Sequence, residues 1–211
     1  MSFLGAGSLP NVPVQFQIRP VSGFHLVKGN ILEFEGDAIV NAANEMCLGG
    51  GGIDGAITDA GGEDMQKARE NLPEIEDGVR CPTGRSVITT SGDLRRTTPI
   101  KYVIHAVGPV FKRGVPMMSP VNQESRELVE SAVVHALITA ASEPTIRRVA
   151  FPVISGGIFA SGQEFDAIWS CFNAFDSQLR IGCPLYGRFD EVAFYAYTDE
   201  EYSKIQNVYN Y

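Results

Sequence analysis

The sequence predicts an α/β fold in which helices cover both faces of a central sheet, and three observations support this prediction. Short apolar or β-branched segments alternate along the chain with longer segments of helical periodicity. Most connections between the strand segments contain a helix, which favours parallel pairing in the middle of the sheet. No change of composition divides the chain, so we expect one domain over residues 14–211, preceded by a flexible lead-in over residues 1–13 that is rich in Gly, Pro and Ser.

Strands are expected where a short segment alternates apolar and polar residues or is rich in β-branched residues. Residues 24–28 lie between two glycines, and residues 38–40 are wholly apolar, as in a strand that is buried on both faces. We expect the early strands to pair antiparallel at one edge of the sheet. The full set of expected strands is 14–18, 24–28, 38–40, 86–91, 101–107, 147–154 and 191–197.

Helices are expected between these strands, and the longest covers residues 123–142, where apolar residues recur with helical periodicity. Two more helices are expected to begin at capping boxes, in which a Ser or Thr is followed three residues later by Glu. These are Ser161 with Glu164 and Thr198 with Glu201. Residues 108–120 contain three prolines and are expected to form a surface loop.

The composition excludes several classes of function. The chain has 211 residues, of which 44% are hydrophobic and 20% charged, as in an ordinary globular protein. A net charge of −8 argues against nucleic-acid and membrane partners, because phosphate-rich surfaces are bound by an excess of Lys and Arg. The N-terminus lacks the pattern of a signal peptide. We therefore expect a monomeric intracellular protein of the cytoplasm, the nucleus or both.

The cysteines and histidines do not suggest a metal site. The four cysteines, Cys47, Cys81, Cys171 and Cys183, have no C-x-x-C spacing and are expected to be free thiols in a reducing compartment. The histidines are scattered, and His105 lies within an apolar strand, where a hydrogen-bonded structural role is expected. We expect no metal and no cofactor.

Four consecutive glycines, Gly49–Gly52, separate the apolar strand 38–40 from a helix that begins at Ile53. A glycine loses more backbone freedom on folding than any other residue. A run of them is therefore expected where the backbone must approach a ligand or adopt positive φ. The helix has apolar residues every three or four positions, ends at Gly61-Gly62 and is followed by a second helical piece over 63–72. We expect main-chain N–H groups at its start to hold an anion.

A second glycine-bearing turn, residues 155–160, follows the strand 147–154 and precedes another helix. Both turns would lie at the carboxyl ends of strands, where open α/β sheets bind their ligands. Together they would suit a diphosphate, although tight strand-to-helix turns would have a similar composition. Gly50, Gly52 and Gly55 match a dinucleotide-binding pattern, but a long segment separates them from the preceding strand and no acidic residue follows at the required distance. No P-loop is present.

The sequence resembles the macrodomain family, and the landmarks that carry the resemblance occur in the family's order over residues 24–205. The GGGGIDG segment is most similar to the MacroD-type branch. The resemblance implies a three-layer α/β/α macrodomain-like fold, with a mixed, mostly parallel central sheet flanked by helices. The landmarks are 29–31 (GNI), 37–44 (DAIVNAAN), 49–57 (GGGGIDGAI), 81–84 (CPTG), 103–109 (VIHAVGP) and 151–159 (FPVISGGIF).

The resemblance implies a site for ADP-ribose. Asn30 and the backbone of Ile31 would contact the adenine, with Tyr197 beside the ring face. The turn at 155–159 and the amide of Ile53 would hold the diphosphate, and the glycine run would surround the distal ribose. The ligand-binding residues implied in this way are Asn30, Ile31, Gly50, Gly51, Gly52, Ile53, Ser155, Gly156, Gly157, Ile158, Phe159 and Tyr197.

Asp54 and Asn44 are the residues that the resemblance implies for catalysis. Asp54 would align or activate a water molecule against the ester at the distal ribose, and Asn44 would fix that ribose. From the residues alone, an Asp in the first turn of a helix would equally serve to complement the helix dipole.

Three residues depart from the family's pattern. Thr58 stands where the MacroD pattern usually has His, which removes one orienting partner for Asp54. Phe159 replaces the usual Tyr and keeps the ring without its hydroxyl group, while Asn30 replaces the usual Asp and keeps an acceptor oxygen. These changes bear on turnover more than on binding.

The function that this resemblance implies is hydrolysis of mono-ADP-ribose from acidic side chains of proteins, with deacetylation of O-acetyl-ADP-ribose as a related activity. ADP-ribose and mono-ADP-ribosylated proteins would then be the partners. Two alternatives stay open: a non-catalytic module that reads ADP-ribosylated partners, and a hydrolase of small derivatives such as ADP-ribose-1″-phosphate.

Overall fold

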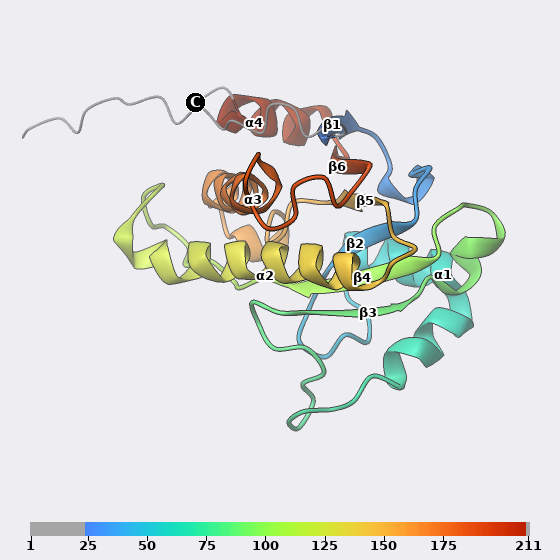
Figure 1. The fold of residues 1–211 in the computed structure, drawn as a ribbon. Helices are drawn as coiled ribbons and strands as arrows, with labels where there is room; N and C mark the ends of the chain where they lie inside the picture. Colours follow the sequence, from blue (N-terminus) through green and yellow to red (C-terminus); the bar gives the residue numbers. More distant parts are fainter. Residues whose placement is uncertain (1–23, 210–211) are drawn as a thin grey trace, which may run out of the picture.

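The computed structural model describes residues 24–209, which form one six-stranded sheet flanked by helices (Figure 1). The strand order is β1-β6-β5-β2-β4-β3. The expected lead-in 1–13 and the expected strand 14–18 lie outside the described residues. The strands are β1 (Phe24–Lys28), β2 (Ala38–Ala43), β3 (Ser86–Thr90), β4 (Tyr102–Val107), β5 (Arg148–Phe151) and β6 (Glu191–Ala196).

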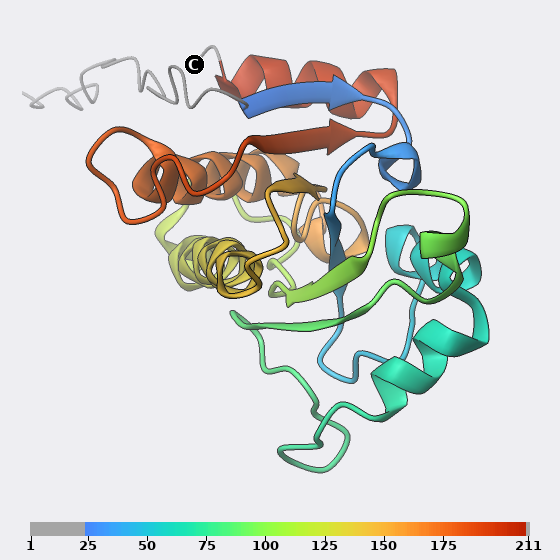
Figure 2. The same cartoon turned by 45° about the vertical axis from the view of Figure 1, so that its right-hand side comes forward.

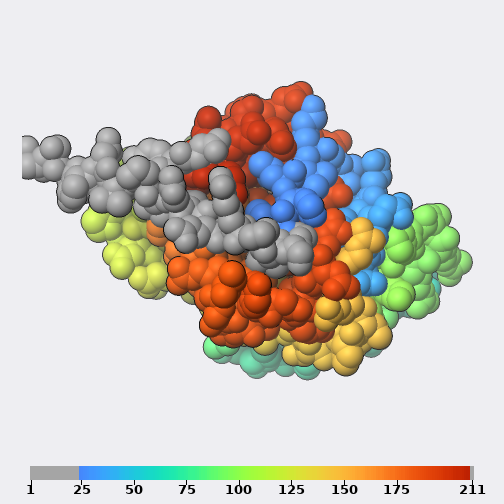
Figure 3. All heavy atoms as spheres, turned by 45° about the horizontal axis from the view of Figure 1, so that its top comes forward, coloured from blue at the N-terminus to red at the C-terminus, as the bar shows by residue number. Residues whose placement is uncertain are grey.

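Within residues 24–209 the sheet is mostly parallel, and only β3, which pairs with β4, runs antiparallel. The expected antiparallel pairing of the early strands stays a prediction, because strand 14–18 lies outside the described residues and the structure describes only β1 of that pair. This strand runs parallel to β6, and Phe24 lies opposite Val192 although the two strands are at opposite ends of the described chain. Figure 3 shows β1 beside the C-terminal segment. A periodicity argument cannot place this strand, because its partner follows it by more than a hundred residues.

The four α-helices occupy both faces of the sheet, as the sequence predicted. They are α1 (Ile53–Glu70), α2 (Gln123–Ser142), α3 (Glu164–Leu179) and α4 (Asp199–Tyr209). Figures 1 and 2 show α2 and α3 on one side of the sheet and α1 on the other. No helix among residues 24–209 is long and apolar enough to cross a membrane.

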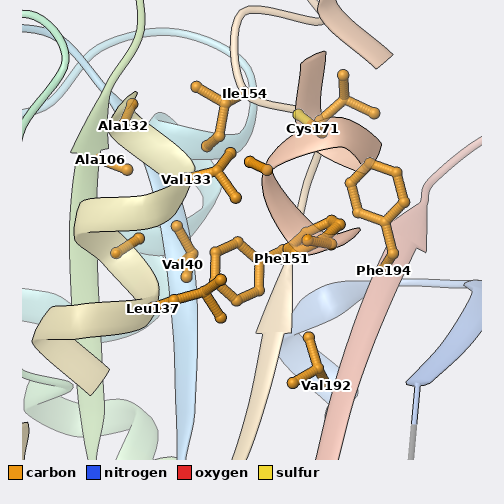
Figure 4. Close-up of a cluster of buried hydrophobic side chains, with 14 of the residues drawn as sticks. Val40, Ala106, Ala132, Val133, Leu137, Phe151, Ile154, Cys171, Val192 and Phe194 are labelled. Carbon is orange, nitrogen blue, oxygen red and sulfur yellow. The ribbon is translucent and has the colours of Figure 1, made fainter. Parts of the chain in front are cut away.

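The two largest apolar clusters of the core lie on opposite faces of the sheet. Along β2, Ile39 belongs to the cluster beneath α1, whereas Val40 belongs to the larger cluster beneath α2, α3 and α4. This is the alternation that a strand buried on both faces requires. In the larger cluster, Phe151 of β5 lies between Leu137 of α2 and the side chains of α3 (Figure 4).

The helix starts agree only in part with the predicted capping boxes. At α4, the Glu201 amide donates to the Thr198 hydroxyl group at 3.1 Å, as in a capping box. At α3 the prediction was wrong, since Ser161 is left-handed (φ 51°) and the residue before the helix is Gln163, whose side chain does not cap it. Ser161 instead closes the 3-10 helix η4 (Ile158–Ala160).

The sheet opens between β5 and β2. These strands pair only at Ala38–Val149 and Ile39–Ala150, whereas β2 stays paired with β4 as far as Ala43 and Val107. The chain leaves β2 toward one side of the sheet and β5 toward the other, because the strand order is β6-β5-β2-β4. This is a topological switch point, where open α/β sheets form a ligand crevice beyond the carboxyl ends of their strands.

Candidate functional site

A cleft of about 900 Å³ lies at this carboxyl edge. Its walls come from the segments that follow β1, β2, β4, β5 and β6 and from the facing ends of α1, α3 and α4. This volume is in the range of small-molecule and cofactor sites. All the candidate site residues predicted from the sequence line it: Asn30, Ile31, Asn44, Gly50, Gly51, Gly52, Ile53, Asp54, Ser155, Gly156, Gly157, Ile158, Phe159 and Tyr197. Their contacts with a ligand remain predictions.

The glycine run forms one wall. Gly49 and Gly52 have φ of 116° and 61°, values that residues other than glycine rarely adopt. The backbone conformation of the run therefore requires glycine at these two positions. Gly52 precedes α1, and no side chain caps the helix there. The first amides of α1 therefore face the cleft without a capping side chain, which is the arrangement that binds anions at helix N-termini.

The second turn, residues 155–159, forms the facing wall and is supported from behind by the loop 108–120. The Ser155 hydroxyl group donates to the Pro109 carbonyl at 2.7 Å, and the Phe111 amide donates to the Phe159 carbonyl at 2.8 Å. Ser155 has a φ of 57°, and Gly157 precedes η4 without a side-chain cap. The loop thus fixes a turn whose main chain is directed at the cleft.

The end of the cleft beside β1 and β6 has groups that could bind a flat polar ring. The Asn30 side-chain oxygen accepts a hydrogen bond from the Leu32 amide at 3.1 Å, which leaves one lone pair for a ligand. Tyr197 stands at the mouth with 74% of its surface exposed. An exposed aromatic ring that lines a cleft is suited to stacking against a planar ligand.

Asp54 lies in the first turn of α1 and is 3% exposed. Its Oδ1 atom accepts hydrogen bonds from Arg69 Nη2 at 2.7 Å and from Asn41 Nδ2 at 2.8 Å. Its Oδ2 atom is buried and has no hydrogen-bond partner among residues 24–209. A Cβ atom at Gly50 would lie 3.0 Å from Oδ2, so this oxygen is directed at the glycine run that lines the cleft. The carboxylate therefore has one oxygen that is held and one buried oxygen, beside the glycine run, whose hydrogen-bonding capacity is unused.

Arg69 is a site residue that sequence reasoning missed. It is fully buried, and it also donates to the Cys47 carbonyl through Nε and to the Thr58 hydroxyl group through Nη1 at 2.7 Å. In a straight helix, residues fifteen positions apart lie about 22 Å apart along the axis. Arg69 reaches Asp54 because α1 is kinked at Gly62 (φ 62°), between the two helical pieces that the sequence predicted. The glycine pair was the only signal, and it did not identify the partner.

Asn44 and Cys47 shape the bend before the glycine run. The Asn44 side chain donates to the Gly49 carbonyl at 2.9 Å and accepts from the Met46 and Cys47 amides. One of its Nδ2 hydrogens is thus used within the loop, which leaves the second for a ligand. Cys47 is fully buried in this bend and is a free thiol, as the sequence predicted.

His105 extends the network behind Asp54. It is fully buried, and its ring nitrogens lie 3.0 Å from Asn41 Nδ2 and 2.9 Å from the Thr89 hydroxyl group. Burial, aided by the charge of Arg69, lowers the pKa of His105 to about 3. The imidazole is therefore neutral at pH 7, and the structural role expected for it agrees with this position.

We expect His105 to make the protein less stable as the pH falls from 7 to 5. The unfolded chain takes up a proton near pH 6.5 that the folded chain does not take up until about pH 3. Between pH 7 and 5 this group alone should lower the free energy of unfolding by about 2 kcal/mol. Urea denaturation at both pH values measures the loss, and His105→Gln should reduce it. An equal loss in the variant would contradict the assignment.

Among residues 24–209, no group of three or more His, Cys, Asp or Glu side chains is arranged to hold a metal ion. The polar groups of the cleft include main-chain amides, the side chains of Asn30 and Asn44 and the buried carboxylate of Asp54. The starts of α3 and α4 add charged side chains to the lining: Glu164, Glu200, Glu201 and Lys204.

Together, the fold and the cleft define a class: an α/β domain with a crevice at its switch point, an uncapped helix start facing that crevice and a buried aspartate in its wall. Residues 40–164 match the model of the Macro domain family. A macro domain-containing protein of Cupriavidus necator is 41% identical over 184 residues, which cover 86% of this chain and 95% of that protein. The chain belongs to the Macro domain family.

Relatives and solved structures extend this comparison. An O-acetyl-ADP-ribose deacetylase of Escherichia fergusonii is 33% identical over 88% of this chain and 94% of that protein. The Oceanobacillus iheyensis macrodomain with ADP superposes with a TM-score of 0.69 at 28% identity and covers 87% of both chains. A mutant of the same macrodomain with ADPR has a TM-score of 0.68 at 27% identity, over 87% of this chain and 89% of that one.

Proposed function

We propose that this protein binds ADP-ribose in the cleft and hydrolyses the ester that links mono-ADP-ribose to acidic side chains of proteins. The observation that carries the proposal is the state of Asp54. Its buried carboxylate has one oxygen held by Arg69 and Asn41, and the other oxygen, beside the glycine run, has no partner in the described part of the chain. A buried polar atom without a partner is costly unless a ligand or water completes it.

The binding part of the proposal rests on the two amide-rich walls. The uncapped start of α1 and the turn at 155–159 both present main-chain donors, so they suit a diphosphate without any cationic side chain. Asn30 and Tyr197 lie at the end of the cleft formed by β1 and β6, where the adenine would lie. The distal ribose would then lie over Gly50–Gly52, next to Asp54. The ADP and ADPR in the Oceanobacillus iheyensis structures support this choice of ligand.

The chemistry that this geometry supports is attack by water on the ester. Asp54 Oδ2 would accept a proton from a water molecule while the oxygen of that water bonds to the ester carbonyl carbon. The bond between that carbon and the ribose oxygen then breaks, and the proton passes to the ribose oxygen. The products are a free carboxyl side chain and ADP-ribose, so one water molecule is consumed. The main-chain amides would hold the ribose and diphosphate in place during the step.

Deacetylation of O-acetyl-ADP-ribose is a second candidate activity, which the Escherichia fergusonii relative favours. The acetyl group is also an ester on the distal ribose, so the same attack by water would release acetate. The two substrates differ in what lies outside the cleft: a protein in one case and a methyl group in the other.

A substrate comparison tests the proposal. The purified protein should bind ADP-ribose by calorimetry, and it should release ADP-ribose from a protein that is modified on glutamate. O-acetyl-ADP-ribose is measured in parallel by acetate release. If only acetate is released, the protein substrate is wrong and the deacetylase is correct. Binding of ADP-ribose without turnover of either ester would identify a reader, and no binding at millimolar ADP-ribose would contradict the whole proposal.

A further inference from the structure

The buried pair of Asp54 and Arg69 is the part of the site whose role the resemblance does not explain. Thr58 occupies the position one turn after Asp54, and its hydroxyl group contacts the Asp54 backbone, not its carboxylate: it donates to the Asp54 carbonyl at 2.7 Å. The side chain that contacts the carboxylate comes instead from the other half of the kinked helix. We propose that Arg69 is the positioning residue of the reaction, which fixes the Asp54 carboxylate and the glycine run in one arrangement. This inference rests on the proposed hydrolase function.

The guanidinium group of Arg69 is connected to three parts of the site at once. Its Nη2 atom holds Asp54 Oδ1, its Nη1 atom donates to the Thr58 hydroxyl group, and its Nε atom donates to the Cys47 carbonyl just before the glycine run. All three interactions are shielded from solvent, because Arg69 has no exposed surface. A planar fork of donors can satisfy three acceptors in fixed directions, which a lysine ammonium group cannot reproduce.

The asymmetry of Asp54 is what gives this network a role in the reaction. Both protein hydrogen bonds, from Arg69 and Asn41, end on Oδ1, and the partnerless Oδ2 is the atom directed at Gly50. The two oxygens of a carboxylate are equivalent, so a half-turn restores the same arrangement, but any smaller rotation would lengthen the 2.7 Å contact with Arg69. Arg69 therefore fixes the plane of the carboxylate and the place of its second oxygen relative to the glycine run.

A purely structural role predicts something different. Removal of a guanidinium group from a buried ion pair destabilises a protein whether or not the pair contributes to catalysis. The chain provides a matched control in Arg126 and Asp166, a second Arg–Asp pair with an N–O distance of 3.0 Å and little exposure. Neither residue lines the cleft. If Arg69 has a positioning role, replacement of Arg69 should lower kcat, and replacement of Arg126 should not.

The experiment compares Arg69→Lys and Arg126→Lys in the full chain, with release of ADP-ribose from a glutamate-modified protein as the readout. Arg69→Lys should lower kcat about 30-fold, because small misplacements of a catalytic group cost up to about 100-fold. Its affinity for ADP-ribose should stay within about threefold of wild type, since Arg69 does not line the cleft. Arg126→Lys should keep the wild-type kcat. Thr58→Val, which removes one acceptor of Arg69 and preserves the shape, should lower kcat about threefold and serves if Arg69→Lys does not fold.

Four outcomes would overturn the inference. A folded Arg69→Lys variant with wild-type kcat would show that Asp54 does not need the guanidinium group of Arg69. If only Thr58→Val folds, an unchanged kcat in that variant would show the same. Equal losses of kcat in Arg69→Lys and Arg126→Lys, matched by equal losses of melting temperature, would reduce Arg69 to a stabilising residue. A wild-type protein that binds ADP-ribose without releasing it would overturn the hydrolase itself, and that result differs from the others because it appears before any variant is made.

Discussion

Replacement of Asp54 by Ala is expected to lower the rate of ADP-ribose release by about 1,000-fold. The carboxylate is the proposed acceptor of the water proton, and general base catalysis contributes about 100- to 10,000-fold. Affinity for ADP-ribose should change little, because the groups proposed to hold the ligand are the amides of the glycine run and of the turn 155–159. The measurement is single-turnover release from a glutamate-modified protein, with calorimetry on the same preparation.

Two companion variants separate chemistry from stability in this prediction. Asp54→Ala leaves Arg69 buried without its partner, which costs stability. Asp54→Asn keeps the volume and an oxygen that can accept from Arg69, so it should fold better and remain equally inactive. Asp166→Asn removes the charge from the other buried Arg–Asp pair and should retain activity. Wild-type rates in Asp54→Asn would remove Asp54 from the mechanism.

The second large effect is expected from Gly157→Glu, which should weaken binding of ADP-ribose by about 100-fold or more. Gly157 lines the cleft, and a Cβ atom there would meet nothing within 4 Å, so the side chain has room without disturbing the fold. Like charges about 4 Å apart repel by about 4 kcal/mol at an effective dielectric constant of 20. A carboxylate in this turn would therefore repel a diphosphate bound in the cleft.

Calorimetry measures this loss, and a control variant isolates the effect of position. Ile181→Glu adds the same charge at a residue that is 70% exposed and lies outside the cleft lining, so its affinity should equal that of wild type. If Gly157→Glu and wild type bind with the same Kd, the turn at 155–159 does not hold the phosphates.

The sequence predicted the fold well because the decisive signals are local. The apolar segment at Ile39 and Val40 is buried on both faces, and the glycine pair before Glu63 marks a break that the structure places at Gly62. The pairing of β1 with β6 could not be predicted, because it depends on contacts between the two ends of the described chain. The failed capping box at Ser161 shows the same limit, since the turn that supports the cleft determines the backbone there.

Prediction of the site was limited in a similar way. All the residues chosen from the two glycine turns and from the family resemblance line the cleft, since each lies at the end of a strand or the start of a helix. Arg69, Asn41 and His105 form the network behind Asp54 and were not predicted as site residues. Two of them lie inside strands, where they resemble core positions, and the third reaches the site only through a kink. Side chains that position a catalytic group do not follow a characteristic spacing in the sequence, so the sequence alone does not identify them.

The central claim is that a cleft which binds ADP-ribose also breaks the ester at its distal ribose. The most direct test is a single-turnover experiment in which wild-type protein, in excess over a glutamate-modified mono-ADP-ribosyl protein, is sampled for free ADP-ribose. We predict that ADP-ribose is released and that added free ADP-ribose slows its release by competition for the cleft. Stable binding of the modified protein, with the ester intact after prolonged incubation, would contradict the claim.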